Sequence, residues 1–197
     1  MEQVKNSTKK NISAMSTARP SELSRTSDVV AKHGKADEFC DKFTPDLQLR
    51  YHKNLRAVVE NESVSLTKVA QAYGESDMKY WLKLQISELG KIFKGGDDDM
   101  MNKLADMIYT ARPDLKVTEI MAFLGGVSMG EYGEVYGFDA YQIIRLLPNF
   151  IRKRNLIMDE IAQEQRKREA EEHAKRAITR EEYEELKRKE NEQGRNL

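Results

Sequence analysis

Apolar residues recur every three or four positions along most of the chain, and this spacing constrains the fold more than any other sequence feature. In the segment after Thr44-Pro45-Asp46, such a set would lie on one face of a helix; its members are Leu47, Tyr51, Leu55, Val58 and Val59. The Thr-Pro-Asp stretch combines an N-cap residue, a proline at the first helical position and an acid in the first turn. The sequence therefore predicts one helix from Pro45 to about Glu60.

The same pattern continues to Ile161, and no segment shows the strict alternation typical of a strand. We therefore expect an all-α protein with a compact multi-helix core. Glycine, proline and acidic residues set the expected boundaries. The first expected helices are one in 28–43 weakened by Gly34 and two joined at Gly74. A helix capped by the aspartates of 97–99 and an apolar helix of 117–124 ending at Gly125-Gly126 are expected next. The last expected core helix follows Asp139, with a kink near Leu147 before Pro148.

Charge divides the chain into three expected segments. Charged residues make up 34% of the sequence, above the average of about 25% for globular proteins, so part of the chain is expected to be solvated. We expect a disordered basic arm in 1–27, a helical core domain in 28–160 and a charged helical tail in 161–197. Residues 1–35 contain seven Lys or Arg and three Asp or Glu, which suits either nucleic-acid binding or a plain solvated arm.

Several classes of function have no support in the sequence. The single cysteine, Cys40, excludes an internal disulfide and suits a reducing compartment, and no apolar run approaches the length of a membrane helix. We expect a cytoplasmic protein without a membrane segment. The three histidines lack ligand spacing, the aspartates of 97–99 suit a helix cap better than a metal site, and no phosphate-binding loop is present. We expect no metal, no cofactor and no enzymatic activity.

One connection, GVSMGEYGEVYGFD in residues 126–139, holds four glycines and two tyrosines. Glycines permit turns and close backbone approach, and tyrosines offer flat amphipathic surface. The stretch is either a compact loop whose tyrosines fold back onto the helices, or a contact loop for bases or a partner protein. Arginines seven positions apart on one helix face follow it. The candidate contact residues are Gly130, Tyr132, Gly133, Tyr136, Gly137, Arg145, Arg152, Lys153 and Arg154.

A second candidate site is a helix-turn-helix in residues 66–86. Ala70 and Gly74 stand four apart, as that motif prefers, and the following helix offers Lys79 and Lys83 to DNA. Glu75 stands where an apolar residue is usual. The alternative interpretation is two consecutive core helices joined by a glycine C-cap.

The segment from Leu115 to Arg154 resembles a pattern found in small helical proteins of bacterial phages and mobile elements. The pattern here is Leu115, Glu119-Ile120, the G-x-Y-G-x-x-Y-G stretch of 130–137, Asp139 and the basic end at 152–154. Some proteins of this kind are similar to replication accessory factors, including loaders of replicative helicases. This chain lacks an ATP-binding loop, so the resemblance implies no ATP-driven mechanism.

These observations lead to three functional hypotheses. The first is a non-enzymatic accessory factor of phage or mobile-element DNA metabolism that binds DNA, a replication protein or both. The second is a protein–protein adaptor or a structural or scaffold component of a phage particle. It suits the charged tail and the core, since residues 36–150 contain thirteen Lys or Arg and eighteen Asp or Glu. The third is a repressor that uses Ala70 and Gly74. DNA and a replication or phage protein are thus both candidate partners.

Overall fold

The computed structural model describes residues 28–176, 182–185 and 187–188. The regular elements of these residues are helices, and one isolated β-bridge joins Ser65 to Lys116. The prediction of an all-α protein is therefore confirmed. The expected disordered arm in 1–27 lies outside the described residues, and so does most of the expected charged tail after Arg176.

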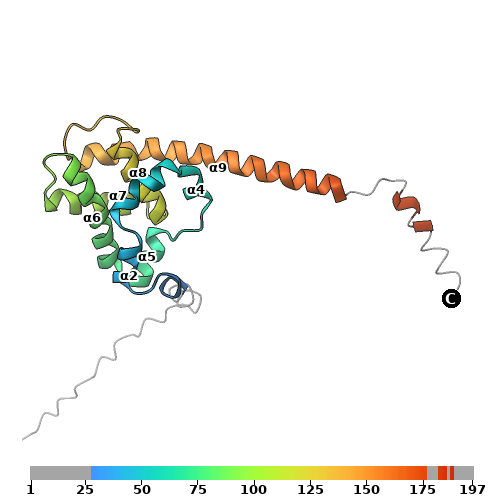
Figure 1. The fold of residues 1–197 in the computed structure, drawn as a ribbon, viewed down its shortest axis with the longest axis horizontal. Helices are drawn as coiled ribbons and strands as arrows, with labels where there is room; N and C mark the ends of the chain where they lie inside the picture. Colours follow the sequence, from blue (N-terminus) through green and yellow to red (C-terminus); the bar gives the residue numbers. More distant parts are fainter. Residues whose placement is uncertain (1–27, 177–181, 186, 189–197) are drawn as a thin grey trace, which may run out of the picture.

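The helices form a compact head from which one long helix extends (Figure 1). A helical segment at 28–33 comes first. It is followed by α2 (Ala36–Lys42), the 3-10 helix η1 (Pro45–Leu47), α3 (Gln48–Lys53), α4 (Leu55–Glu60), α5 (Leu66–Tyr73), α6 (Glu75–Ile92), α7 (Asp98–Ala111), α8 (Val117–Ser128) and α9 (Ala140–Arg176). The α9 helix runs along one side of the head and continues well beyond it.

Two expected helices are divided in the structure. The helix predicted from Pro45 to Glu60 is wrong as a single element, because the chain breaks at Asn54 between α3 and α4. The Asn54 side chain donates to the carbonyl oxygen of Arg50 at 2.9 Å, which offers this carbonyl an alternative to a helical hydrogen bond. Gly34 has a φ of 80° and separates the 28–33 segment from α2, so it divides the first helix rather than weakening it.

Helix capping at the aspartates follows the prediction. Asp97 is the N-cap of α7, and its side chain accepts a hydrogen bond from the backbone nitrogen of Met100 at 2.8 Å. Asp98 and Asp99 fall in the first turn, where negative charge is stabilised by the helix dipole.

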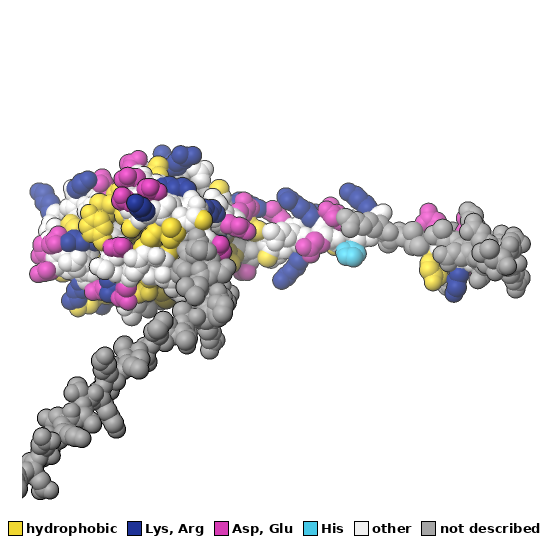
Figure 2. Space-filling view, turned by 90° about the horizontal axis from the view of Figure 1, so that it is seen from below, with side chains coloured by type: hydrophobic (Ala, Val, Ile, Leu, Met, Phe, Trp, Pro, Cys, Tyr) yellow, Lys and Arg dark blue, Asp and Glu magenta, His cyan; other side chains and the backbone are white. Residues whose placement is uncertain are grey.

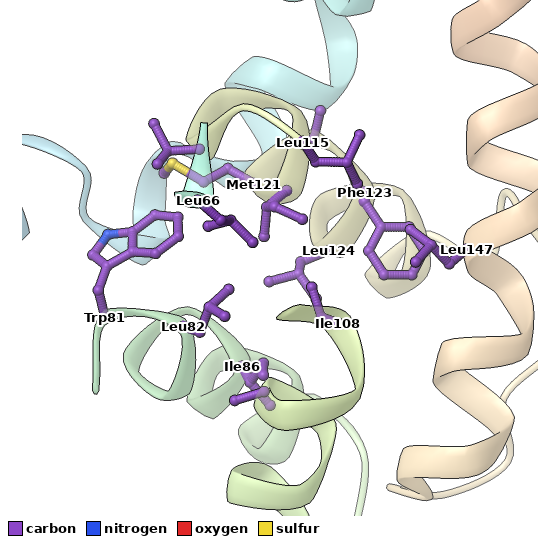
Figure 3. Packing of buried hydrophobic residues seen from close by; sticks show 14 of the residues in the cluster. Leu66, Trp81, Leu82, Ile86, Ile108, Leu115, Met121, Phe123, Leu124 and Leu147 are labelled. Carbon is purple, nitrogen blue, oxygen red and sulfur yellow. The ribbon is translucent and has the colours of Figure 1, made fainter. Parts of the chain in front are cut away.

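The centre of the head is α8, in which every residue from Val117 to Val127 is buried. A helix that is apolar on all sides belongs inside a core. Figure 3 shows side chains of the surrounding helices converging on it. The labelled members are Leu66 of α5, Trp81, Leu82 and Ile86 of α6, Ile108 of α7, Leu115 before α8, Met121, Phe123 and Leu124 of α8, and Leu147 of α9.

The prediction that this helix ends at Gly125-Gly126 is wrong, because α8 continues to Ser128. The two glycines have a packing role instead. A Cβ atom at Gly125 would lie 2.6 Å from the backbone oxygen of Gln48, so the missing side chain lets α3 approach α8 closely. A Cβ atom at Gly126 would collide with the ring of Tyr132. Tertiary packing, rather than a helix end, explains the pair.

The first half of α9 packs on the head and the second half leaves it. Its inward residues alternate in steps of four and three; they are Ile143, Leu147, Phe150, Arg154, Ile157 and Ile161. The helix continues through Pro148. Near Ile161, Glu164 Oε2 pairs with Arg56 Nη2 of α4 at 2.6 Å. All side chains of 165–175 are exposed, and Figure 2 shows acidic and basic groups interspersed along this projecting part.

Candidate interaction surface

The glycine–tyrosine loop, residues 129–139, turns one of its two tyrosines into the core. Tyr132 is 6% exposed. Its ring stacks on Phe123 at a centroid distance of 5.9 Å and meets Phe150 edge-on at 5.7 Å. Burial raises the pKa of the Tyr132 hydroxyl, with a smaller contribution from Glu131. This ring is therefore part of the packing between α8 and α9 and is not available to stack on a base.

Polar contacts fix the same loop to the head. The Glu131 carboxylate pairs with His52 Nε2 at 2.8 Å and with the ammonium group of Lys153. The side-chain amide of Asn149 donates to the backbone oxygen of Tyr132 at 2.9 Å. The loop is thus held from both α3 and α9.

The glycines of this loop allow the backbone turns that bring its residues against the head. Gly130 has a φ of 72° and Gly133 a φ of 144°, values that residues with a side chain rarely adopt. Gly137 precedes Phe138, whose backbone nitrogen donates to the oxygen of Lys94 at 2.9 Å. Of the residues expected in the G-x-Y-G-x-x-Y-G stretch, Tyr136 alone presents an aromatic ring to solvent. It is 88% exposed, and its hydroxyl donates to the carboxylate of Glu134.

The basic residues after the loop divide into two pairs. Arg145 and Arg152 are exposed on α9. By contrast, Lys153 pairs with Glu131, and Arg154 Nε donates to Glu119 Oε1 at 2.6 Å. Arg154 is only 13% exposed in its side chain. The structure therefore separates the nine expected contact residues. Tyr136, Arg145 and Arg152 are exposed, and Lys153 is exposed as well but pairs with Glu131.

The expected helix-turn-helix is present as two helices joined by a glycine. Gly74 has a φ of 98°, and its nitrogen donates to the oxygen of Ala70 at 2.9 Å. Both lysines of the second helix, however, are engaged by acids. Lys79 pairs with Glu75 at 2.8 Å and with Asp106 of α7 at 2.9 Å. These hydrogen bonds raise the Lys79 pKa.

The second lysine of this helix, Lys83, pairs with Asp98 at the start of α7. Because α7 supplies acids along this side of α6, the two lysines form ion pairs with α7 and do not present a free cationic face to DNA. The geometry favours two core helices joined by a glycine C-cap.

A groove that the sequence did not single out lies between the end of α7 and the middle of α9. It has a volume of about 500 Å³, and its lining residues are Ala111, Arg112, Ile144, Leu147, Pro148, Ile151, Arg152 and Asn155. Its floor is mostly aliphatic, and its polar groups come from two arginines and one asparagine. The spacing of Ile144, Pro148, Ile151 and Asn155 places them on one stripe of α9. This stripe adjoins the inward one.

The two arginines of the groove have different surroundings. Arg112 Nε and Nη2 each donate to a carboxylate oxygen of Asp114 at 2.7 Å. This bidentate pairing lowers the pKa of Asp114. Arg152 is exposed and has no ion-pair partner among the described residues. The groove therefore carries one available positive charge at its edge, at Arg152.

Within the described residues there is no cluster of three or more His, Cys, Asp or Glu side chains that could bind a metal ion. None of the helices described is both long and apolar enough for a membrane span.

A family model matches residues 99–194, and it describes a family of unknown function (DUF6633). Searches of curated proteins and of solved structures gave no match. The matched range contains α8, α9, the glycine–tyrosine loop and every residue that lines the groove. It excludes α2 to α6. The similarity to that family thus falls on the half of the chain that forms the groove.

Proposed function

We propose that this chain is a non-enzymatic protein-interaction module, an adaptor or scaffold component, which binds an amphipathic helix in the groove between α7 and α9. The groove itself is the observation that carries the proposal. It offers an aliphatic floor, formed by Ile144, Leu147, Pro148 and Ile151, that is open to solvent. An amphipathic helix that lays its apolar face into such a groove is a common form of peptide recognition.

Charge at the edge of the groove favours an acidic partner. Arg152 is exposed and unpaired among the described residues, whereas Arg112 is already neutralised by Asp114. Complementary charge at the rim of an interface steers association and selects partners. Asn155 adds a side-chain amide whose nitrogen can donate hydrogen bonds, while its oxygen accepts one from Arg154 Nη1 at 3.3 Å.

A panel of labelled helical peptides tests this function by fluorescence anisotropy. The peptides share one apolar face and carry acidic, neutral or basic polar faces. We expect the acidic peptide to bind best, and we expect Arg152→Glu to reverse the order. Lys91→Glu is the matched control, because Lys91 is exposed on α6 and makes the same charge change outside the groove. Equal binding of all three peptides, or no binding, would contradict the proposal.

A second candidate function is the nucleic-acid contact of an accessory factor in phage or mobile-element DNA metabolism. It is supported by Arg145 and Arg152, which are both exposed and seven residues apart on α9, and by the 88% exposure of Tyr136. Exposed aromatic rings and arginines suit stacking on bases and contacts with phosphates.

This second function is tested with labelled single- and double-stranded DNA at two salt concentrations. Binding that weakens steeply with salt and is reduced by Arg145→Ala with Arg152→Ala would support it. Lys91→Ala is the control, because it removes one positive charge from α6, away from Arg145 and Arg152 of α9. Binding that is absent, or that does not change with salt, would refute it.

A further inference from the structure

The chain itself contains an acidic amphipathic segment of the kind that the groove suits. Residues 181–186 read Glu-Glu-Tyr-Glu-Glu-Leu. Residues 182–185 are helical, and the Tyr183 side chain is 54% exposed. In the sequence, Leu186 follows Tyr183 by three positions, which is the apolar spacing of an amphipathic helix. The segment therefore combines two large apolar residues with four acids.

Groove and segment are complementary in both charge and polarity. The aliphatic floor can accept the Tyr183 and Leu186 side chains, and the cation at Arg152 lies at the edge, where an acidic helix would place its glutamates. Two acids in or just after the second half of α7 are already paired. Asp106 of α7 pairs with Lys79. Asp114 is occupied by Arg112.

The length of α9 prevents a chain from filling its own groove. Asn155 is the groove residue nearest the C-terminus, and Arg176 lies 21 positions further along the same helix, a distance of about 32 Å. Seven further residues lead from Arg176 to Tyr183, and even a fully extended chain covers only about 25 Å over that number. Tyr183 can therefore reach this groove only on another copy of the chain.

We propose that the groove between α7 and α9 binds residues 181–186 of a second copy of this chain. This inference rests on the proposed function, since it names the helix that the groove accepts. If the exchange is reciprocal, two copies form a closed pair in which each projecting α9 carries its end to the groove of the other. Closed two-fold pairs are the commonest form of homo-oligomer.

The first test is the oligomeric state of the full-length chain over a concentration series, measured by size-exclusion chromatography with light scattering. We expect a dimer. Arg152→Glu should weaken dimerisation about tenfold or more, because it places like charges together at the rim. Combining Arg152→Glu with Glu182→Arg and Glu185→Arg should restore part of the loss. Lys91→Glu is again the control and should leave the dimer unchanged.

The second test is disulfide cross-linking in a Cys40→Ser background. One copy carries Asn155→Cys and the other carries Glu182→Cys with a different tag, so that the mixed product is identified by mass. We expect the mixed disulfide to form rapidly. Asp99→Cys in place of Asn155→Cys is the control, because Asp99 is exposed at the opposite end of α7 from the groove.

The outcomes separate this inference from the function on which it rests. A monomer that still binds the acidic peptide would overturn the inference and leave the proposed function standing. A monomer that binds no peptide would overturn both. A dimer that persists in Arg152→Glu and gives no Asn155–Glu182 cross-link above the control would mean that copies meet through another surface, and this too would overturn the inference.

Discussion

Arg154 of α9 and Glu119 of α8 form a buried ion pair, in which Arg154 Nε donates to Glu119 Oε1 at 2.6 Å. The second carboxylate oxygen of Glu119 accepts a hydrogen bond from the backbone nitrogen of Lys116 at 2.9 Å. Both oxygens are thus satisfied, although the Glu119 side chain is 0% exposed. The pair joins the start of the central helix to the helix that leaves the head.

Loss of Arg154 should therefore destabilise the fold strongly. Arg154→Ala leaves a buried carboxylate without its counter-charge, which costs about 3–5 kcal/mol in comparable pairs. We expect a decrease of that size in the free energy of unfolding, measured by urea denaturation followed by circular dichroism. Arg152 lies two positions earlier and is exposed. Arg152→Ala should therefore change the free energy of unfolding by about 0.5 kcal/mol or less. Similar effects of the two substitutions would show that the ion pair does not stabilise the head.

Two glycines inside helices should respond in opposite ways to alanine. A Cβ atom at Gly125 would lie 2.6 Å from a backbone oxygen of α3, so Gly125→Ala must displace a helix and should cost about 1–3 kcal/mol. A Cβ atom at Gly90 of α6 would meet only the mobile end of the Met101 side chain. Gly90→Ala should therefore be neutral, or stabilising by up to about 1 kcal/mol.

Thermal unfolding of both variants beside the wild type checks this contrast. A lower melting temperature for Gly125→Ala together with an unchanged or higher one for Gly90→Ala is the expected result. Equal destabilisation of the two would mean that α3 and α8 tolerate an added methyl group at their contact.

These residues also show what the sequence can and cannot predict. The three-to-four spacing identified the helical class and most helices, because this signal is local. The same spacing also predicts that Arg154 faces inward, because Arg154 lies on the same stripe of α9 as Phe150 and Ile157. Charge alone predicts Arg154 at the surface, whereas the spacing places it among the inward residues of α9.

Other features depend on contacts distant in sequence and could not be predicted locally. The local sequence predicts a helix end at Gly125, yet its role is set by Gln48 of α3. The partners of Lys79 and Lys83 come from α7, which the pattern of α6 alone cannot reveal. The groove likewise requires the end of α7 to lie beside α9. Its aliphatic stripe was present in the sequence, but a free stripe and a covered one have the same pattern.

His33 should make the stability of the head depend on pH. The side chain is 7% exposed, its ring lies among Phe39 and Phe43, and neither nitrogen has a hydrogen-bond partner among the described residues. Burial lowers the pKa of His33 below 6.5, and the nearby charges of Lys42 and Lys32 add to this effect. Below that pH the unfolded chain binds a proton that the folded chain does not.

The stability associated with neutral His33 is therefore complete above about pH 6.5 and is lost as the pH falls toward the lowered folded pKa. Urea denaturation over this range should show a falling free energy of unfolding for the wild type. His33→Leu should have a flatter profile, since it removes the titrating group and keeps an apolar side chain. An identical slope in the variant would assign the pH dependence to other groups.

The two tyrosines of the loop provide the last prediction, because the structure gives them opposite surroundings. Tyr132→Ala removes a ring packed between Phe123 and Phe150 and should reduce the free energy of unfolding by about 3–5 kcal/mol. Tyr136 is 88% exposed, so Tyr136→Ala should change the free energy of unfolding by about 0.5 kcal/mol or less. Urea denaturation of both variants measures this difference.

Tyr132→Phe separates the ring from its hydroxyl. The buried hydroxyl oxygen of Tyr132 has no hydrogen-bond partner among the described residues, so its removal leaves no group unsatisfied and relieves the cost of burying it. We expect Tyr132→Phe to be at least as stable as the wild type, while Tyr132→Ala unfolds at lower urea. A marked loss of stability in Tyr132→Phe would mean that the hydroxyl forms a hydrogen bond in solution. A stable Tyr132→Ala would mean that the loop does not pack on the core, and Tyr132 would again become a candidate contact residue.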